Sequence, residues 1–313
     1  MPRTSKNSKL SATFTITLPA TSANLGPAFD AAALALSMFL RVHAKSADEM
    51  SITARGVDAD ICGDMRDHLI LNTYRQILDR ECRRVAPLRL RLDNEIPIGK
   101  GCGSSAAARL AGIALANHYG HLDWDGNRIV MEAARCEGHV DNVAACWLGG
   151  LAIGRISDDG QVHVARMLPK GKWPLLLAIP DQSLPTEEAR RILPKFYERN
   201  DAVTNIQNSM LLLAALTEGN EPLLAAALED RIHQPYRAQL CPLLPALQPL
   251  SKQRGILGVA LSGAGPSVLI FLDAKASPRK VSQRVRQQLT RQGLAATLIG
   301  ARITRRGAAQ SLC

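Results

Sequence analysis

Aromatic side chains and metal-binding cysteine patterns are scarce in this sequence. Phe, Tyr and Trp make up 4% of the 313 residues, which argues against a nucleic-acid-binding surface built on stacked bases. The 7 cysteines are an odd number, and they form neither a Cys-x-x-Cys pair nor a Cys/His spacing suited to zinc. We therefore expect reduced thiols and a cytoplasmic location.

The sequence also lacks a hydrophobic run long enough to cross a membrane. Its longest apolar run, residues 31–40 with one serine, is about half as long as a transmembrane helix. Residues 1–12 are polar and basic and have no apolar centre typical of a signal peptide, so we expect a flexible leader there. Neither a membrane partner nor secretion is expected.

Acidic residues are absent after Asp273, although the whole chain has a net charge of +10. Residues 275–306 contain nine basic residues, so the rest of the chain carries only about +1. A helix is expected at residues 278–292, where the apolar side chains recur on one face and the arginines lie elsewhere. We expect a solvated outer face and no nucleic-acid partner, with a basic nucleic-acid site as the alternative.

Length and composition predict a globular protein with two lobes, since 313 residues correspond to about two domains and 46% are hydrophobic, and the order of the expected strands and helices indicates an α+β fold. A rise in proline density near residues 169–185 divides the chain into an N-terminal lobe, residues 13–170, and a C-terminal lobe, residues 171–313. The order expected in the second lobe, strand, helices, paired strands, helix and strand, resembles the split β-α-β ferredoxin-like arrangement. Strands are expected in the first lobe at residues 13–18, 41–55, 88–92, 151–156 and 162–167, and helices at residues 69–78, 104–119 and 127–136.

A glycine-rich loop at residues 97–107 is the most informative segment. Its alternating glycines let successive backbone amides point into one concavity, and a helix that begins at the serines adds free N-terminal amides and its dipole. Such a nest suits a polyphosphate, and the alternative is a glycine turn with a serine helix cap. The residues expected to bind nucleotide are Pro97, Ile98, Gly99, Lys100, Gly101, Cys102, Gly103, Ser104, Ser105 and Ala106.

Two other phosphate-binding motifs fit this loop less well. A Walker loop requires Gly-Lys-Ser/Thr after four spacer residues, whereas Lys100 stands between glycines and before the serines. Residues 101–106 match the dinucleotide pattern GxGxxG/A, and Asp123 follows about twenty residues later. In that fold the first glycine directly follows a strand, whereas residues 94–100 intervene here, so a dinucleotide fold is the minor alternative.

Four segments together resemble the GHMP kinases, the superfamily of galactokinase, homoserine kinase, mevalonate kinase and phosphomevalonate kinase. The glycine loop resembles their nucleotide loop, Pro-x-x-x-Gly-x-Gly-Ser-Ser-Ala-Ala. Residues 19–30 resemble the first motif of homoserine kinases, and residues 261–267 resemble the third, a glycine turn that braces the phosphate loop. Residues 137–150 resemble the stretch that follows the loop. The resemblance implies a nucleotide-binding N-terminal lobe and a ferredoxin-like C-terminal lobe.

The sequence departs from the family pattern at a few positions. Ala28 stands where the family usually has Gly, and Ala32 and Ala33 replace a Leu/Met-Gly pair. Cys102 takes the place of an apolar residue in the glycine loop, and His68 takes that of an Asn near the adenine pocket.

The resemblance also implies roles for individual residues. Ser105 and Glu137 would hold Mg²⁺, and Asp141 and Asn142 would be the catalytic residues. An amino-acid acceptor requires a carboxylate near its ammonium group and arginines near its carboxylate. The residues expected to bind such a substrate are Asn24, Asp30, His139, Thr186, Arg190 and Arg237.

The activity that the resemblance implies is ATP-dependent phosphorylation of the side-chain hydroxyl of L-homoserine, a step in threonine biosynthesis. ATP would be the phosphoryl donor and Mg²⁺ the cofactor, and a homodimer is the assembly we consider. The alternatives are a GHMP-type kinase acting on another small alcohol and a non-catalytic ligand-binding homologue. The presence of Ser105, Glu137 and Asp141 argues against the second alternative.

Overall fold

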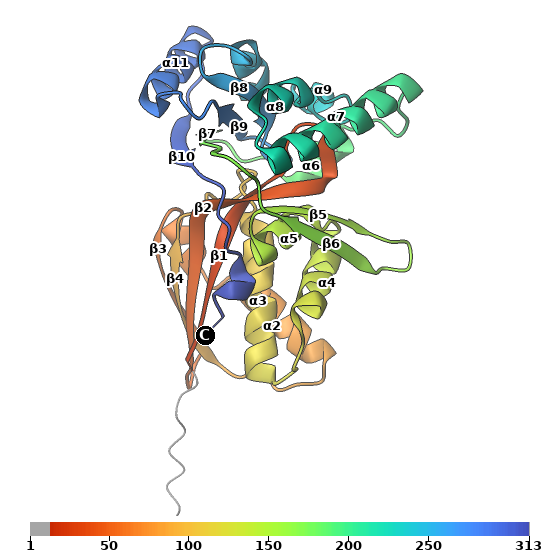
Figure 1. Cartoon of the computed structure of the whole chain (residues 1–313). Coiled ribbons are helices and arrows are strands. Elements are labelled where there is room, and N and C mark those ends of the chain that lie inside the picture. Colours follow the sequence, from red (N-terminus) through yellow and green to blue (C-terminus); the bar gives the residue numbers. More distant parts are fainter. Residues whose placement is uncertain (1–12, 313) are drawn as a thin grey trace, which may run out of the picture.

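The computed structural model describes residues 13–312 and contains two β-sheets, one in each half of the chain (Figure 1). The first sheet has the strand order β3-β4-β2-β5-β6, with β1 paired to β2 outside this path, and the second has the order β10-β7-β9-β8. This arrangement confirms the expected α+β fold with two lobes. The leader expected at residues 1–12 lies outside the described residues.

The sheet of the first lobe is organised around one long strand, β2. β2 pairs with β1 along its whole length, and its two halves pair with β5 and β4. We did not expect a strand in the apolar run at residues 31–40. Residues 32–36 are all buried, which removes the alternation typical of a half-buried strand. The strands are β1 (Thr13–Asn24), β2 (Ala28–Ser46), β3 (Ser51–Gly56), β4 (Leu88–Asn94), β5 (Leu151–Ile156) and β6 (Val162–Met167).

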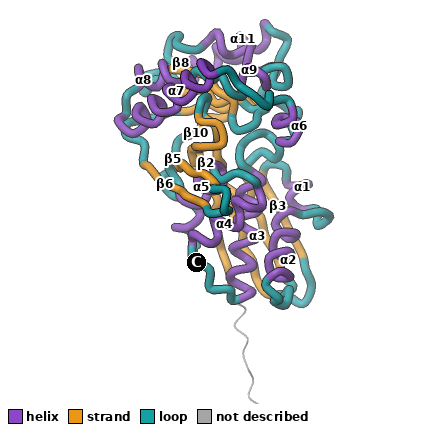
Figure 2. Tube along the Cα trace, turned by 90° about the vertical axis from the view of Figure 1, so that its right-hand side faces the viewer, coloured by secondary structure: helices purple, strands orange, loops and turns teal. Residues whose placement is uncertain are grey.

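Helices cover one face of this sheet, as both views show (Figures 1 and 2). The central helix is α3, most of whose alanines are buried and which packs closely on α2. A Cβ atom at Gly112 would lie 2.6 Å from the carbonyl oxygen of Ile70, so only glycine permits this approach. The sequence patterns predicted α2, α3 and α4 but not the short helices α1 and α5. The helices are α1 (Ala59–Gly63), α2 (Leu69–Arg80), α3 (Ser104–Gly120), α4 (Gly126–Glu137) and α5 (Asp141–Leu148).

The sheet of the second lobe has the strand order of the split β-α-β ferredoxin-like fold, which confirms that expectation. On α11, the expected apolar face of Val281, Val285 and Leu289 is buried, and Arg286 and Arg291 are exposed. The strands are β7 (Leu175–Ile179), β8 (Ile256–Leu261), β9 (Val268–Leu272) and β10 (Thr297–Ala301). The helices are α6 (Thr186–Arg191), α7 (Arg199–Glu218), α8 (Glu221–Ala227), α9 (Gln234–Arg237), α10 (Leu243–Leu247) and α11 (Pro278–Arg291). None of the helices found between residues 13 and 312 is long and apolar enough to cross a membrane.

The segment that follows β10, residues 302–311, returns to the first lobe (Figure 1). The backbone N–H of Thr304 donates to the carbonyl oxygen of Ala35 at 2.9 Å, and that of Gly150 donates to the carbonyl oxygen of Thr304 at 2.8 Å. The C-terminal lobe expected at residues 171–313 thus includes a segment that pairs with the first sheet. The segment lies here because it satisfies backbone groups of the first sheet that would otherwise lack partners.

Truncation after Ala301 is expected to lower the free energy of unfolding by about 3 kcal/mol, because three backbone hydrogen bonds are worth roughly 1 kcal/mol each. Urea unfolding of the full and truncated chains measures the difference. The control is Ser311→Ala, which removes only the hydroxyl that contacts the carbonyl oxygen of Thr17 at 2.9 Å and should cost less. Equal stability of the two chains would contradict this account. The three backbone bonds counted are Thr304 N to Ala35 O, Gly150 N to Thr304 O and Ser37 N to Arg302 O.

Candidate active site

The glycine loop connects β4 to α3 in a conformation that only glycine adopts easily. Gly99, Gly101 and Gly103 have φ angles of 69°, 74° and 73°. A Cβ atom at Gly101 would lie 2.2 Å from the carbonyl oxygen of Ser262, and one at Gly103 would lie 1.8 Å from Oγ1 of Thr21. The alternating glycines therefore serve two purposes, the left-handed backbone and the close packing of the loop on its neighbours.

Two segments distant in the sequence fasten this loop. The backbone N–H of Thr21, near the end of β1, donates to the carbonyl oxygen of Cys102 at 3.0 Å. The hydroxyl of Ser262 donates to the carbonyl oxygen of Gly101 at 2.7 Å. The glycine turn after β8 therefore braces the loop, as the resemblance implied. The free amides at the start of α3 face the same space, which suits an anion.

A hydroxyl and a carboxylate meet beside the loop. Oγ of Ser105 donates to Oε1 of Glu137 at 2.5 Å, and Nε of Arg109 donates to the same oxygen at 2.6 Å. Sequence reasoning missed Arg109, although it follows Ser105 by four residues on α3 and so shares its face. Serine and glutamate oxygens are the donors that Mg²⁺ prefers, and phosphate oxygens complete such a site.

Asp141, the first residue of α5, is almost fully buried, and its Oδ1 accepts several hydrogen bonds. Oδ1 lies 3.0 Å from Nδ1 of His139 and 2.6 Å from the backbone nitrogen of Asn142. Oδ1 of Asn142 in turn accepts a hydrogen bond from Oγ1 of Thr21 at 2.6 Å, which ties α5 to β1. Burial lowers the pKa of His139, but the hydrogen bond and the negative charges of Asp141 and Glu137 outweigh it, so this pKa is raised.

Two arginines line the same pocket and differ in their pairing with carboxylates. Arg190 forms an ion pair with Asp30 through two bonds of 2.8 and 2.7 Å, and this hydrogen bonding raises the pKa of Arg190. Arg237 is 1% exposed and forms no ion pair with any carboxylate of residues 13–312. Burial and the neighbouring charge of Arg190 lower the pKa of Arg237. The guanidinium groups of both arginines also lie over the ring of Phe29, at 5.6 and 5.2 Å.

Asn24 shapes the turn between β1 and β2. Its Oδ1 accepts a hydrogen bond from the backbone nitrogen of Asp30 at 2.9 Å, and its Nδ2 donates to the carbonyl oxygen of Gly263 at 2.7 Å. Asn24 therefore orients Asp30 and fastens the β1–β2 turn to the glycine turn after β8.

A cavity of about 110 Å³ brings most of the expected site residues together. Of the remaining expected residues, Ile98 lines a second cavity and the Cys102 side chain is fully buried. Nζ of Lys100 contacts the carbonyl oxygen of Asp181, and Pro97 lines neither cavity. The lining includes Asn24, Asp30, Gly99, Gly101, Gly103, Ser104, Ser105, Ala106, Glu137, His139, Asp141, Asn142, Thr186, Arg190 and Arg237.

The second cavity, of about 620 Å³, meets the first at Gly99, Ser104 and Ser105. Much of its lining is apolar and comes from α1, α2 and β4, which suits a flat base beside a phosphate loop. His68 lines it, and burial lowers the pKa of this imidazole. Sequence reasoning missed the contribution of α1, because a helix of five residues gives no clear periodic pattern.

Comparison with known proteins agrees with this geometry. Residues 68–150 match the model of the GHMP kinases N terminal domain, and residues 212–291 match that of the GHMP kinases C terminal region. A homoserine kinase of Solibacter usitatus is 46% identical over 261 residues, which cover 83% of this chain and 85% of that protein. A homoserine kinase of Bacillus cereus is 37% identical over 279 residues, or 89% of this chain and 90% of that protein.

A solved structure of homoserine kinase from Cytophaga hutchinsonii has the same fold, with a TM-score of 0.79 at 23% identity over 95% of this chain and 97% of that one. The chain therefore belongs to the GHMP kinases. Within this superfamily its family is that of the homoserine kinases, as the identity to the curated relatives shows.

Gly103→Ala is expected to weaken ATP binding by more than tenfold, because the added Cβ collides with Oγ1 of Thr21 and displaces the loop. Gly99→Ala is the matched control, since its φ is also positive but its Cβ would meet only the Ser183 side chain, at 3.2 Å. Isothermal titration with ATP measures both affinities, and circular dichroism checks the fold. Equal losses of ATP affinity in the two variants would show that backbone strain, and not the collision with Thr21, weakens binding.

Proposed function

We propose that this chain transfers the γ-phosphoryl group of ATP to the side-chain hydroxyl of L-homoserine. The products are ADP and O-phospho-L-homoserine, which is used in threonine biosynthesis. The observation that carries the acceptor assignment is the Arg237 guanidinium, which is buried without a carboxylate partner among residues 13–312 and lines the same cavity as the phosphate loop. Burying an unpaired cation is costly, and the carboxylate of an amino acid offsets that cost.

The charges on this side of the cavity complement an amino-acid zwitterion. Asp30 is the carboxylate for the ammonium group, and its ion pair with Arg190 places opposite charges side by side. An amino-acid zwitterion carries the same two charges on groups attached to one carbon and can contact both members of the pair. Arg190 and Arg237 then face its carboxylate, and Thr186 and His139 line the remaining wall. An uncharged sugar or alcohol would not require a carboxylate and two arginines in its binding site.

The nucleotide side of the site fits ATP. The loop from Gly99 to Gly103 and the start of α3 provide backbone amides for the phosphates, and the adjoining apolar cavity accommodates the base. Ser105 and Glu137 would hold Mg²⁺, which would neutralise charge on the transferred phosphoryl group.

Asp141 and Asn142 are placed to orient the acceptor hydroxyl. The hydrogen bonds to Oδ1 of Asp141 fix the carboxylate in one orientation, and its Oδ2 forms no hydrogen bond or ion pair within residues 13–312. Oδ2 accepts the hydrogen bond of the attacking hydroxyl and keeps its oxygen in line with the γ-phosphoryl group. Because Asn142 is tied to Thr21, this alignment is coupled to the phosphate loop.

A cytoplasmic location and a homodimer belong to the same proposal. The cytoplasm is supported by the six free cysteines found within residues 13–312. A homodimer is supported by exposed apolar side chains on α7, at Val203, Ile206 and Met210, which a second copy of the chain would cover. Sedimentation equilibrium of the full chain tests the assembly.

Arg237→Leu and Arg190→Leu are each expected to lower kcat/KM for homoserine by about 30- to 1000-fold. Each variant leaves a partly desolvated carboxylate short of a charged partner, which costs on the order of 2 to 4 kcal/mol. The KM for ATP should change little, because the nucleotide contacts the loop and not these arginines. Steady-state kinetics in which each substrate is varied in turn measures both effects. Wild-type kcat/KM for homoserine in both variants would refute the amino-acid assignment.

Glu137→Gln is expected to raise the Mg²⁺ concentration needed for half-maximal rate and to lower kcat, since a neutral amide is a weaker ligand for a hard cation. The measurement is the rate at saturating ATP as Mg²⁺ is varied. Arg109→Gln is the control, because it removes the cation that competes for Oε1 of Glu137 and leaves the carboxylate in place. A wild-type Mg²⁺ dependence for Glu137→Gln would remove this residue from the metal site.

A further inference from the structure

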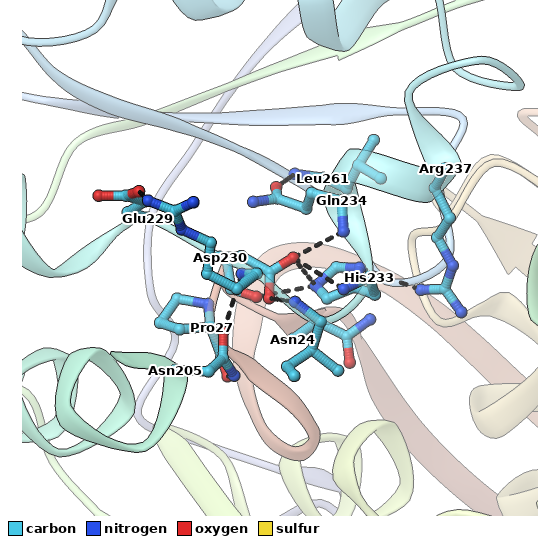
Figure 3. A network of polar contacts seen from close by, with 12 residues as sticks. Asn24, Pro27, Asn205, Glu229, Asp230, His233, Gln234, Arg237 and Leu261 are labelled. Carbon is cyan, nitrogen blue, oxygen red and sulfur yellow. Dashed lines mark hydrogen bonds and ion pairs between the residues drawn. The ribbon is translucent and has the colours of Figure 1, made fainter. Parts of the chain in front are cut away.

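His233 lies directly before α9 and connects the β1–β2 turn to Arg237 (Figure 3). Its side chain is fully buried, with Nε2 2.8 Å from the carbonyl oxygen of Gly26 and Nδ1 3.2 Å from Nη1 of Arg237. Its ring also stacks on Phe29, with centroids 5.2 Å apart. In the proposed function this imidazole contacts neither the nucleotide, the metal ion nor the acceptor.

The ring of His233 has two hydrogen bonds and one longer contact, from Nε2 to Oδ2 of Asp230 at 3.5 Å, and the two hydrogen bonds define its protonation state. A carbonyl oxygen only accepts hydrogen bonds, so Nε2 must carry the proton that is donated to Gly26. A guanidinium only donates, so Nδ1 must be unprotonated to accept from Arg237. The charged groups around the ring are Asp230, Arg237 and Asp30, and burial lowers the pKa of His233, which favours the neutral form. A neutral imidazole with its proton on Nε2 satisfies both neighbours.

The segment that carries His233 is itself held rigidly. Oδ2 of Asp230 accepts hydrogen bonds from the backbone nitrogens of His233 and Gln234, at 3.0 and 2.6 Å (Figure 3). Oε1 of Gln234 accepts a hydrogen bond from the backbone nitrogen of Leu261 at 2.7 Å, next to the turn that braces the phosphate loop. The imidazole is therefore presented to Arg237 from a fixed backbone.

The guanidinium of Arg237 has few other restraints. Its Nε donates to the carbonyl oxygen of Ala189 at 2.9 Å, and within residues 13–312 its side-chain acceptor is Nδ1 of His233. With Nε and one Nη1 proton engaged, the remaining N–H groups are free for a ligand, and Arg237 lines the cavity. The hydrogen bond to His233 therefore sets the orientation of the Arg237 guanidinium plane, and with it the direction of the remaining N–H groups.

We propose that His233 is a positioning residue for the acceptor, whose Nδ1 holds the Arg237 guanidinium in the orientation that receives the acceptor's carboxylate. Its Nε2 proton anchors this arrangement to Gly26, in the turn that leads to Asp30. His233 therefore sets the distance between the group for the carboxylate and the group for the ammonium, which selects an α-amino acid. The inference rests on the proposed homoserine kinase activity.

Two substitutions at His233 separate its two hydrogen bonds. In His233→Asn, the side-chain oxygen lies near the place of Nδ1 and can still accept from Arg237. In His233→Gln, the amide can still donate to Gly26 but the acceptor for Arg237 is lost. We expect the KM for homoserine to rise roughly tenfold or more in His233→Gln and to stay within about threefold in His233→Asn. The KM for ATP should stay within about twofold in both, which a general loss of structure would not allow.

A double-mutant cycle tests whether His233 acts through Arg237. In an Arg237→Leu background, His233→Gln should cause no further loss of kcat/KM for homoserine, because the guanidinium that it positions is absent. Multiplicative losses in the double variant, equal losses in the Asn and Gln variants, or parallel changes in both KM values would overturn the inference. Failure of the proposed function would give a different result from failure of this inference. In that case Arg237→Leu alone would leave homoserine kinetics unchanged, or the wild-type chain would not phosphorylate homoserine.

Discussion

The close approach of three backbone segments at the phosphate loop is the constraint on which the site depends. The loop, the end of β1 and the turn after β8 lie so close that Cβ atoms at Gly101 and Gly103 would overlap neighbouring atoms. Hydrogen bonds from Thr21 and Ser262 to loop carbonyls hold the three together. Because β1 belongs to the first lobe and β8 to the second, this contact also fixes the two lobes relative to each other.

Each group of functional side chains is placed with respect to this contact. Asn142 is tied to Thr21, which places α5 and Asp141 beside the loop. Asn24 is tied to Gly263, which places the turn carrying Asp30 beside the same brace. The phosphate side and the acceptor side of the cavity are thus built on a common support, and in-line transfer needs such a fixed relation between donor and acceptor.

The acceptor side has an unbalanced charge distribution. Asp30 and Arg190 neutralise each other, whereas Arg237 is buried with only neutral partners, a carbonyl oxygen and an imidazole nitrogen. Burial of an unpaired cation destabilises the folded chain, and such unfavourable features concentrate where a ligand supplies the missing charge. In the proposed function, this imbalance is the physical basis of acceptor recognition.

The glycine loop, its two supporting motifs and the family could be predicted from the sequence alone. Each of these motifs is a short continuous segment, and its residue types and backbone conformation do not depend on knowing the rest of the fold. The sequence also predicted the ferredoxin-like order of the second lobe and the buried face of α11. The tertiary structure alone decided that β2 runs through residues 31–40, that residues 302–311 return to the first lobe, and that Asp30 pairs with Arg190. The same holds for the orientation of Arg237 by His233, which precedes α9 but acts through Gly26 about two hundred residues earlier. These features arise from burial on two faces and from partners distant in sequence, which no local pattern encodes.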